Sequence, residues 1–194
     1  DWLFNNRIRL SGNYLYDEFV IDKIQKAEGK EHGEAYSARI AYTPIYSDKN
    51  IMTAYTTFVY VGTPTFRHGM GTNNFVQRGH PLGWQRGSDG QELTVGLNYF
   101  NRASLIASIA GGMLQTGEES ITSRIFEPYA DYLKGSFPSG TVSETLFFDA
   151  NIQWWWKPNL SFMSGIQWDA IFSGISEVTF NIGIDVYWPA GFTI

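Results

Sequence analysis

The chain has 194 residues, a formal net charge of −5, 16% aromatic residues, only 17% charged residues and no cysteine. The aromatic content excludes a disordered chain, and the lack of cysteine excludes a disulfide scaffold and thiolate metal sites. The acidic balance argues against a general nucleic-acid binder, which needs a basic surface to contact phosphates. Mean hydropathy is −0.21, as in soluble proteins, so the aromatic excess needs a separate explanation.

Alternation of apolar and polar residues, the pattern of a β-strand with two different faces, recurs eight times along the chain. In chain order the predicted strands lie near residues 7–17, 36–42, 51–62, 92–99, 103–115, 145–156, 160–169 and 178–188. The last segment is the clearest, since Val178, Phe180 and Ile182 share one face with the apolar residues that follow. These strands run about 9–14 residues, against a usual five or six in soluble sheets and about 9–11 needed to cross a bilayer.

Six of the seven predicted connections between these strands alternate between long and short, and the last, 172–175, breaks the alternation only by being brief. The long ones are 22–33, 63–91 and 117–143, and the short ones are 47–50, 101–102, 157–159 and 172–175. Outer-membrane barrels have short periplasmic turns and longer outside loops. This pattern predicts an all-β fold, namely an antiparallel transmembrane outer-membrane β-barrel with about eight strands in this chain, located in the bacterial outer membrane.

Aromatic residues gather at the ends of the predicted strands. Tyr46, Tyr99, Phe100, Trp154, Trp155, Trp156, Tyr187 and Trp188 flank the short turns, and Tyr16, Tyr36, Tyr60 and Trp168 lie at the opposite ends. Transmembrane barrels carry aromatic girdles at both interfaces, and their polar lumen face keeps mean hydropathy low. The alternative is a soluble barrel or sandwich with its aromatic face turned inward.

The connection 63–91 carries most of the chemistry that the sequence offers. It holds Arg67, His68, Arg78, His80 and Arg86 but a single acid, Asp89. Guanidinium groups match the geometry of carboxylates and phosphates, and Trp84 can stack on a sugar ring. One interpretation is therefore a contact with acidic polysaccharide or lipid phosphate. The other is that these arginines pair with lumenal acids such as Asp149, Asp169 and Glu92 and plug the barrel.

The sequence offers little support for catalysis. It contains no Gly-x-Ser-x-Gly nucleophile motif and no HExxH or His-x-His metal spacing. We therefore expect a non-catalytic protein without a metal or cofactor. Two other functions stay open at this point, namely a pore or channel, and a small self-contained barrel with a lipid-modifying or structural role.

Two stretches resemble a known family. Arg78-Gly79-His80-Pro81-Leu82-Gly83, followed by Gly87-Ser88-Asp89-Gly90 and a strand, is similar to the Gly-His-x-Leu-Gly…Ser-Asp loop of capsule-assembly Wzi-type outer-membrane proteins. The segment 15–22 more weakly resembles the acidic strand end found midway through those proteins. Separately, Asn181-x-Gly183-x-x-Val186-x-Trp188 resembles the signal of a final barrel strand that the barrel insertion machinery reads during assembly.

The resemblance implies an outer-membrane lectin that anchors capsular or other surface polysaccharide and is surrounded by outer-membrane lipid and lipopolysaccharide. It covers about the C-terminal half of such proteins, so we expect residues 1–194 to be a C-terminal segment of a larger barrel. A single complete eight-stranded barrel is the alternative. The predicted polysaccharide-binding residues are Arg67, His68, Arg78, His80, Trp84, Arg86 and Asp89.

Overall fold

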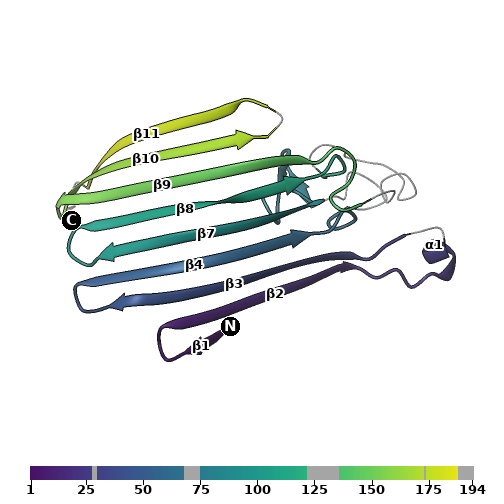
Figure 1. Cartoon of the computed structure of the whole chain (residues 1–194), viewed down its shortest axis with the longest axis horizontal. Coiled ribbons are helices and arrows are strands. Elements are labelled where there is room, and N and C mark those ends of the chain that lie inside the picture. Colours follow the sequence, from purple (N-terminus) through teal and green to yellow (C-terminus); the bar gives the residue numbers. More distant parts are fainter. Residues whose placement is uncertain (28–29, 68–74, 122–135, 173, 188–194) are drawn as a thin grey trace, which may run out of the picture.

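The computed structural model describes residues 1–27, 30–67, 75–121, 136–172 and 174–187. Its main feature is one antiparallel sheet in the order β1-β2-β3-β4-β7-β8-β9-β10-β11 (Figure 1). The eight long strands are β2 (Ile8–Glu18), β3 (Gly33–Tyr46), β4 (Asn50–Val61), β7 (Gly90–Asn101), β8 (Leu105–Thr116), β9 (Ser143–Lys157), β10 (Leu160–Ile171) and β11 (Ser176–Val186). Each corresponds to a strand predicted from the alternation, so the all-β antiparallel prediction is confirmed.

Four shorter elements have no counterpart in the sequence-based prediction. Strand β1 (Trp2–Phe4) pairs with the start of β2, and helix α1 (Lys23–Ala27) lies in the connection from β2 to β3. Strands β5 (Val76–Gln77) and β6 (His80–Pro81) form a separate two-stranded hairpin. Among the described residues, no helix has the length and apolar composition needed to cross a membrane.

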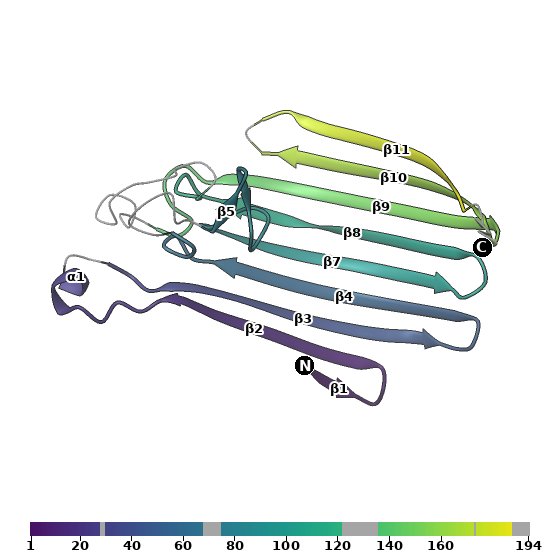
Figure 2. The ribbon, with the colours of Figure 1, turned by 180° about the vertical axis from the view of Figure 1, so that it is seen from behind.

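The long connections lie at one end of the sheet, and three of the four short connections predicted from the sequence lie at the other. The turns at 47–49, 102–104 and 158–159 lie at one end, which we call the turn end. Helix α1 and the β5–β6 hairpin lie at the other, which we call the loop end (Figures 1 and 2). The predicted division into short turns and long loops is therefore confirmed for six of the seven connections. The exception is the short connection between β10 and β11, which lies at the loop end.

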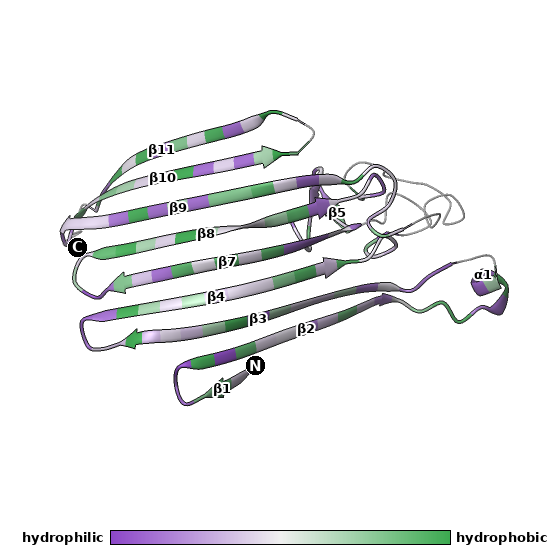
Figure 3. Ribbon diagram, in the orientation of Figure 1, coloured by the Kyte–Doolittle hydropathy of each residue, from purple (hydrophilic) through white to green (hydrophobic). Residues whose placement is uncertain are grey.

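Cross-strand pairing keeps the alternation in phase across the centre of the sheet, so that hydropathy alternates along the strands (Figure 3). Register shifts occur near strand ends, between Tyr16 and Glu18, Tyr42 and Ile45, and Leu160 and Ser161. Residue Ala38 of β3 pairs with Phe58 of β4, Phe58 with Leu93 of β7, and Leu93 with Met113 of β8. The same face continues through Leu146, Ala170 and the residues Val178, Phe180, Ile182, Ile184 and Val186 of β11. One face of the sheet is therefore apolar from β2 to β11, and we call it the apolar face.

The apolar face is exposed rather than packed against a second layer. Val95 in central strand β7 is 56% exposed, and Phe180 and Ile182 in β11 are 71% and 87% exposed. The buried apolar residues among those described are few: Val20, Ala35, Val61, Leu114 and Ile121. Leaving a large apolar side chain in water forgoes about 1.5–3 kcal/mol of burial free energy. A face of this extent therefore calls for a lipid or protein covering.

The opposite face carries the polar residues of the alternation, and we call it the polar face. It presents Arg9, Arg39, Glu92, Asp149, Asn151, Asp169 and Asp185. Both edges of the sheet are open within the described residues. Strand β1 pairs with only Ile8–Leu10 of β2, and β11 pairs with β10 alone. Among the described residues β11 and β2 do not pair with each other, so closure of the sheet into a barrel is not shown.

A close packing contact on the polar face gives a test of this register. Tyr55 of β4 is the cross-strand partner of Gly96 in β7, and a Cβ atom built at Gly96 would lie 2.4 Å from Cζ of Tyr55. The tyrosine ring therefore lies across the glycine. We expect Gly96→Ala to lower the free energy of unfolding by about 1–3 kcal/mol through overpacking, measured by denaturant unfolding followed by circular dichroism.

The matched control is Gly12→Ala in β2, where the nearest atom to the added Cβ would be 3.9 Å away. The free energy of unfolding of that variant should therefore stay close to the wild-type value. Adding Tyr55→Ala to Gly96→Ala should remove the clash and recover part of the loss. An equal loss in both glycine variants would contradict the proposed register.

Candidate functional site

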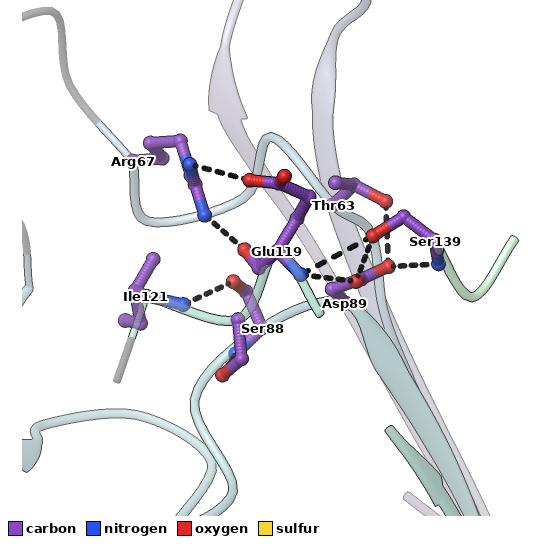
Figure 4. A network of polar contacts seen from close by, with 8 residues as sticks. Thr63, Arg67, Ser88, Asp89, Glu119, Ile121 and Ser139 are labelled. Atoms are coloured by element: carbon purple, nitrogen blue, oxygen red, sulfur yellow. Dashed lines mark hydrogen bonds and ion pairs between the residues drawn. The ribbon is translucent and has the colours of Figure 1, made fainter. Parts of the chain in front are cut away.

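The loop end of the sheet is organised around the buried carboxylate of Asp89 (Figure 4). This residue is fully buried, directly precedes β7 and has a left-handed backbone with φ of 57°. Its carboxylate accepts hydrogen bonds from Thr63 Oγ1 at 2.8 Å, from the backbone N–H of Ser139 at 3.0 Å and from that of Glu119 at 3.1 Å. It also accepts one from the Ser139 hydroxyl. A buried carboxylate needs several donors of this kind to offset its lost hydration.

A second buried interaction links the same loops. Arg67, which is 2% exposed, forms an ion pair with Glu119 through Nη1 and Oε2 at 3.4 Å. Its Nη2 also donates to the backbone carbonyl of Glu119. Beside it, the backbone N–H of Ile121 donates to Ser88 Oγ at 3.1 Å. These contacts tie the residues around 63–67, 86–89, 117–121 and 139 into one unit, which we call the loop network.

The β5–β6 hairpin carries the exposed basic residues. Its two turn residues, Arg78 and Gly79, both have positive φ, 53° and 81°, as a two-residue turn of type I′ between antiparallel strands requires. Glycine adopts this conformation freely. Gln77 then pairs with His80, and Val76 with Pro81. The turn places Arg78 at the hairpin tip and His80 on the strand that leads back toward the sheet.

A pocket of about 440 Å³ lies between this hairpin and the loop ends of β8 and β9. Its walls include His80, Gln85 and Arg86 from the connection, and Thr116, Ser120 and Thr145 from the sheet side. We call it the loop-end pocket. The Ser120 hydroxyl donates to the carbonyl of Arg86 at 3.1 Å, which fixes the arginine segment to the loop network. The pocket is lined by one guanidinium, one imidazole, hydroxyls and an amide, and by no carboxylate.

The structure divides the predicted binding residues into two groups. His80 and Arg86 are exposed and share the loop-end pocket, with Arg78 exposed nearby at the hairpin tip. Arg67 and Asp89 are buried in the loop network. Trp84 is half-buried, with its ring against Gly90 at the start of β7. The remaining predicted residue, His68, lies outside the described residues.

Several residues of the site carried no signal in the sequence. Glu119 is the ion-pair partner of Arg67, and it stands 52 residues away along the chain. Ser139 is 50 residues from Asp89. Of the side chains that form hydrogen bonds in the loop network, only Ser88 and Asp89 belong to the motif quoted from the sequence. Within the described residues, no group of three or more His, Asp or Glu side chains is arranged to hold a metal ion.

Comparison with known proteins gives no match. No protein-family model, no curated protein and no solved structure matches this chain. The class that the fold defines is therefore an all-β protein with one long antiparallel sheet, one exposed apolar face and an ordered loop network at one end. The resemblance to capsule-assembly proteins stays a prediction based on the quoted residues.

The loop network gives a second test. We expect Asp89→Asn to destabilise the loop end by about 3 kcal/mol. The substitution removes the negative charge that strengthens the hydrogen bonds to Asp89. It also places the NH₂ group of the amide against N–H and O–H groups that are themselves donors. The readout is limited proteolysis of the purified protein, with cleavage in the connections 62–89 and 117–142 accelerated. Asp48→Asn, at an exposed position in the turn-end connection 47–49, is the matched control. Unchanged cleavage in Asp89→Asn would remove the structural role given to this carboxylate.

Proposed function

We propose that the chain forms part of an outer-membrane β-barrel that binds surface polysaccharide through its loop end and performs no catalysis. The apolar face would contact lipid, the polar face would line the interior, and the loop end would face the outside of the cell. The observation that carries the binding function is the loop-end pocket, which combines Arg86 and His80 with hydroxyl groups and lacks a lining carboxylate.

Three features support the membrane part of this proposal. The long strands have 11 to 15 residues, enough to cross a bilayer at the tilt of a barrel strand. The exposed apolar face suits lipid contact. Aromatic rings also form contacts near both ends of that face: Tyr36 and Tyr60 stack at 4.7 Å near the loop end, and Trp154 and Phe162 at 6.0 Å near the turn end. Aromatic belts of this kind mark the two interfaces of transmembrane barrels.

A membrane location also requires that the sheet edges be paired. Unpaired backbone N–H and C=O groups in hydrocarbon cost several kcal/mol each, and the edges of β2 and β11 are open in the described residues. We propose that further strands pair with these edges in a larger barrel. Direct pairing of β11 with β2 would instead give an eight-stranded barrel.

The loop-end pocket suits an acidic sugar unit. The planar guanidinium of Arg86 matches a carboxylate through two parallel N–H···O bonds. Thr116, Thr145 and Gln85 offer side-chain donors and acceptors for sugar hydroxyls. Arg78 at the exposed hairpin tip extends the positive surface beyond the pocket. An extended acidic polysaccharide would therefore contact the tip and the pocket together.

The loop network favours binding over conduction. The pocket is shared by the hairpin and by Leu114 and Thr145, which are neighbours on the polar face. The hairpin and the segment 85–86 therefore lie over the polar face instead of extending away from it. In a barrel this arrangement would narrow the lumen at its outer end.

Substitution of the exposed basic residues tests the binding function. We expect the combined variant Arg78→Gln, His80→Gln, Arg86→Gln to lose at least about tenfold in affinity for an acidic oligosaccharide, because each lost charge-assisted hydrogen bond contributes about 1.5–3 kcal/mol. Calorimetry on the purified protein measures this, and release of capsule into the medium is the cellular readout. Arg67 is left intact because it is buried in the loop network.

Arg102→Gln, in the turn-end connection 102–104, is the control and should bind like the wild type. Equal affinity of the triple variant and the wild type would contradict the proposed pocket. Planar-bilayer conductance of the wild type checks the pore alternative, and a steady open conductance would favour it.

Single-cysteine labelling tests the membrane location independently of binding, since the chain has no cysteine of its own. Val95 lies on the apolar face and Asn98 on the polar face of the same central strand, β7, and both are exposed. In outer-membrane vesicles we expect Val95→Cys to resist a water-soluble maleimide and Asn98→Cys to react more readily. Rapid labelling of both variants in intact vesicles would argue against a lipid-facing sheet.

A further inference from the structure

Charges on the polar face are segregated by strand. The arginines lie on β2, β3 and the turn before β2, as Arg7, Arg9 and Arg39. The acids lie mainly on the other side of the sheet, as Glu92, Asp149, Asp169, Glu177 and Asp185 on β7 and β9–β11. The arginine cluster is near the turn end, whereas the loop-end pocket lies over β8 and β9 at the opposite end.

The three arginines surround one pocket of about 520 Å³. We call it the arginine pocket. Its other polar walls are Asn6 and the hydroxyls of Ser11, Thr43 and Thr53, and no carboxylate lines it. Thr43 Oγ1 and Thr53 Oγ1 lie 3.0 Å apart and share one hydrogen bond. One of these two hydroxyls therefore still has a proton to donate to another acceptor.

The surrounding strands hold the guanidinium groups in place. Arg39 is paired with Ser11 across the β2–β3 ladder, two residues along the strands from the pair of Arg9 with Ala41. The Cζ atom of Arg39 lies 4.1 Å from the centroid of the Tyr55 ring. The outer edge of that ring, with Cζ, Oη and Cε1, in turn lies against Gly96. The cation–π contact and the glycine beneath it thus fix Arg39 over the sheet.

Little negative charge within the described residues offsets this cluster. Arg9 Nη2 contacts Asp1 Oδ2 at 2.8 Å, but the two side chains are 62% and 59% exposed, and such surface pairs contribute little. Arg7 Nη1 donates to a neutral acceptor, the carbonyl of Pro44, at 3.5 Å. Three guanidinium groups with one exposed carboxylate leave an excess of two positive charges. Like charges gathered in this way are stabilised by a bound anion.

We propose that the arginine pocket binds a small oxyanion through the guanidinium groups of Arg7, Arg9 and Arg39. Carboxylate and phosphate share the planar or branched oxygen geometry that guanidinium forks recognise, and the threonine and serine hydroxyls supply further donors. The site is distinct from the loop-end pocket and does not depend on the polysaccharide-binding proposal. Its ligand would reach it from the polar face, near the turn end.

The test is isothermal titration of the purified full chain in neutral detergent with inorganic phosphate, and separately with glucuronate. The two arms distinguish a phosphate from a carboxylate ligand, and the affinity should fall as ionic strength rises. We expect Arg9→Gln and Arg39→Gln each to weaken binding about tenfold, because each substitution removes one charge-assisted hydrogen bond to the anion. Arg9→Lys and Arg39→Lys keep the charge without the fork and should give intermediate affinities.

Arg102→Gln again serves as the control, because it removes an arginine near the turn end that does not line the pocket. Circular dichroism checks that each variant is folded, and the lysine variants keep the test valid where a glutamine variant fails to fold. Failure of both anions to bind the wild type would overturn the proposal, as would equal loss in Arg102→Gln. Binding that is seen only in Asp185→Asn would also overturn it. The carboxylate of Asp185 on β11 would then be the group that neutralises the arginines in the wild type.

Discussion

Backbone hydrogen bonds between neighbouring strands hold the eight long strands in one register, and the remaining features of the sheet depend on it. Because side chains alternate between the two faces of a strand, a shift of one residue in any pair would move that strand's apolar residues to the other face. Pairs such as Phe58 with Leu93, and Leu93 with Met113, show that no such shift occurs in the centre of the sheet. One register therefore produces both the apolar face and the polar face.

The loop end adds a second level of order, which the register alone does not supply. Because the strands are antiparallel, the connections 62–89 and 117–142 both begin and end at the same end of the sheet. The carboxylate of Asp89 accepts hydrogen bonds from donors in both connections. Burial makes this arrangement specific, since a buried carboxylate tolerates few geometries. The exposed pair of His80 and Arg86 keeps its position because the segment behind it is anchored through Ser120.

The sequence was sufficient to predict the strands because their signal is local. Period-two alternation over 178–188 predicts β11 without knowledge of its partner, and the short turns follow from the gaps between alternating segments. The two-residue strands β5 and β6 are too short to show a period. The partners in the loop network could not be predicted either, since Arg67 and Glu119 meet only after the sheet brings residues 52 positions apart together. Composition identified the loop as basic but could not tell its buried arginine from its exposed ones.

This distinction between buried and exposed arginines explains how one residue type has different roles in the same fold. Arg67 lies where two loops close over it and finds an internal carboxylate, so its charge is used to hold the structure together. Arg86 lies at the rim of a pocket lined by no acid, and Arg7, Arg9 and Arg39 lie around another. Their guanidinium groups face solvent, with at most an exposed carboxylate beside them. An anion from outside the chain then becomes the favourable partner, because a charge-assisted hydrogen bond is stronger than a neutral one. In both proposed sites, the placement of acids along the sheet would therefore determine where an anion binds.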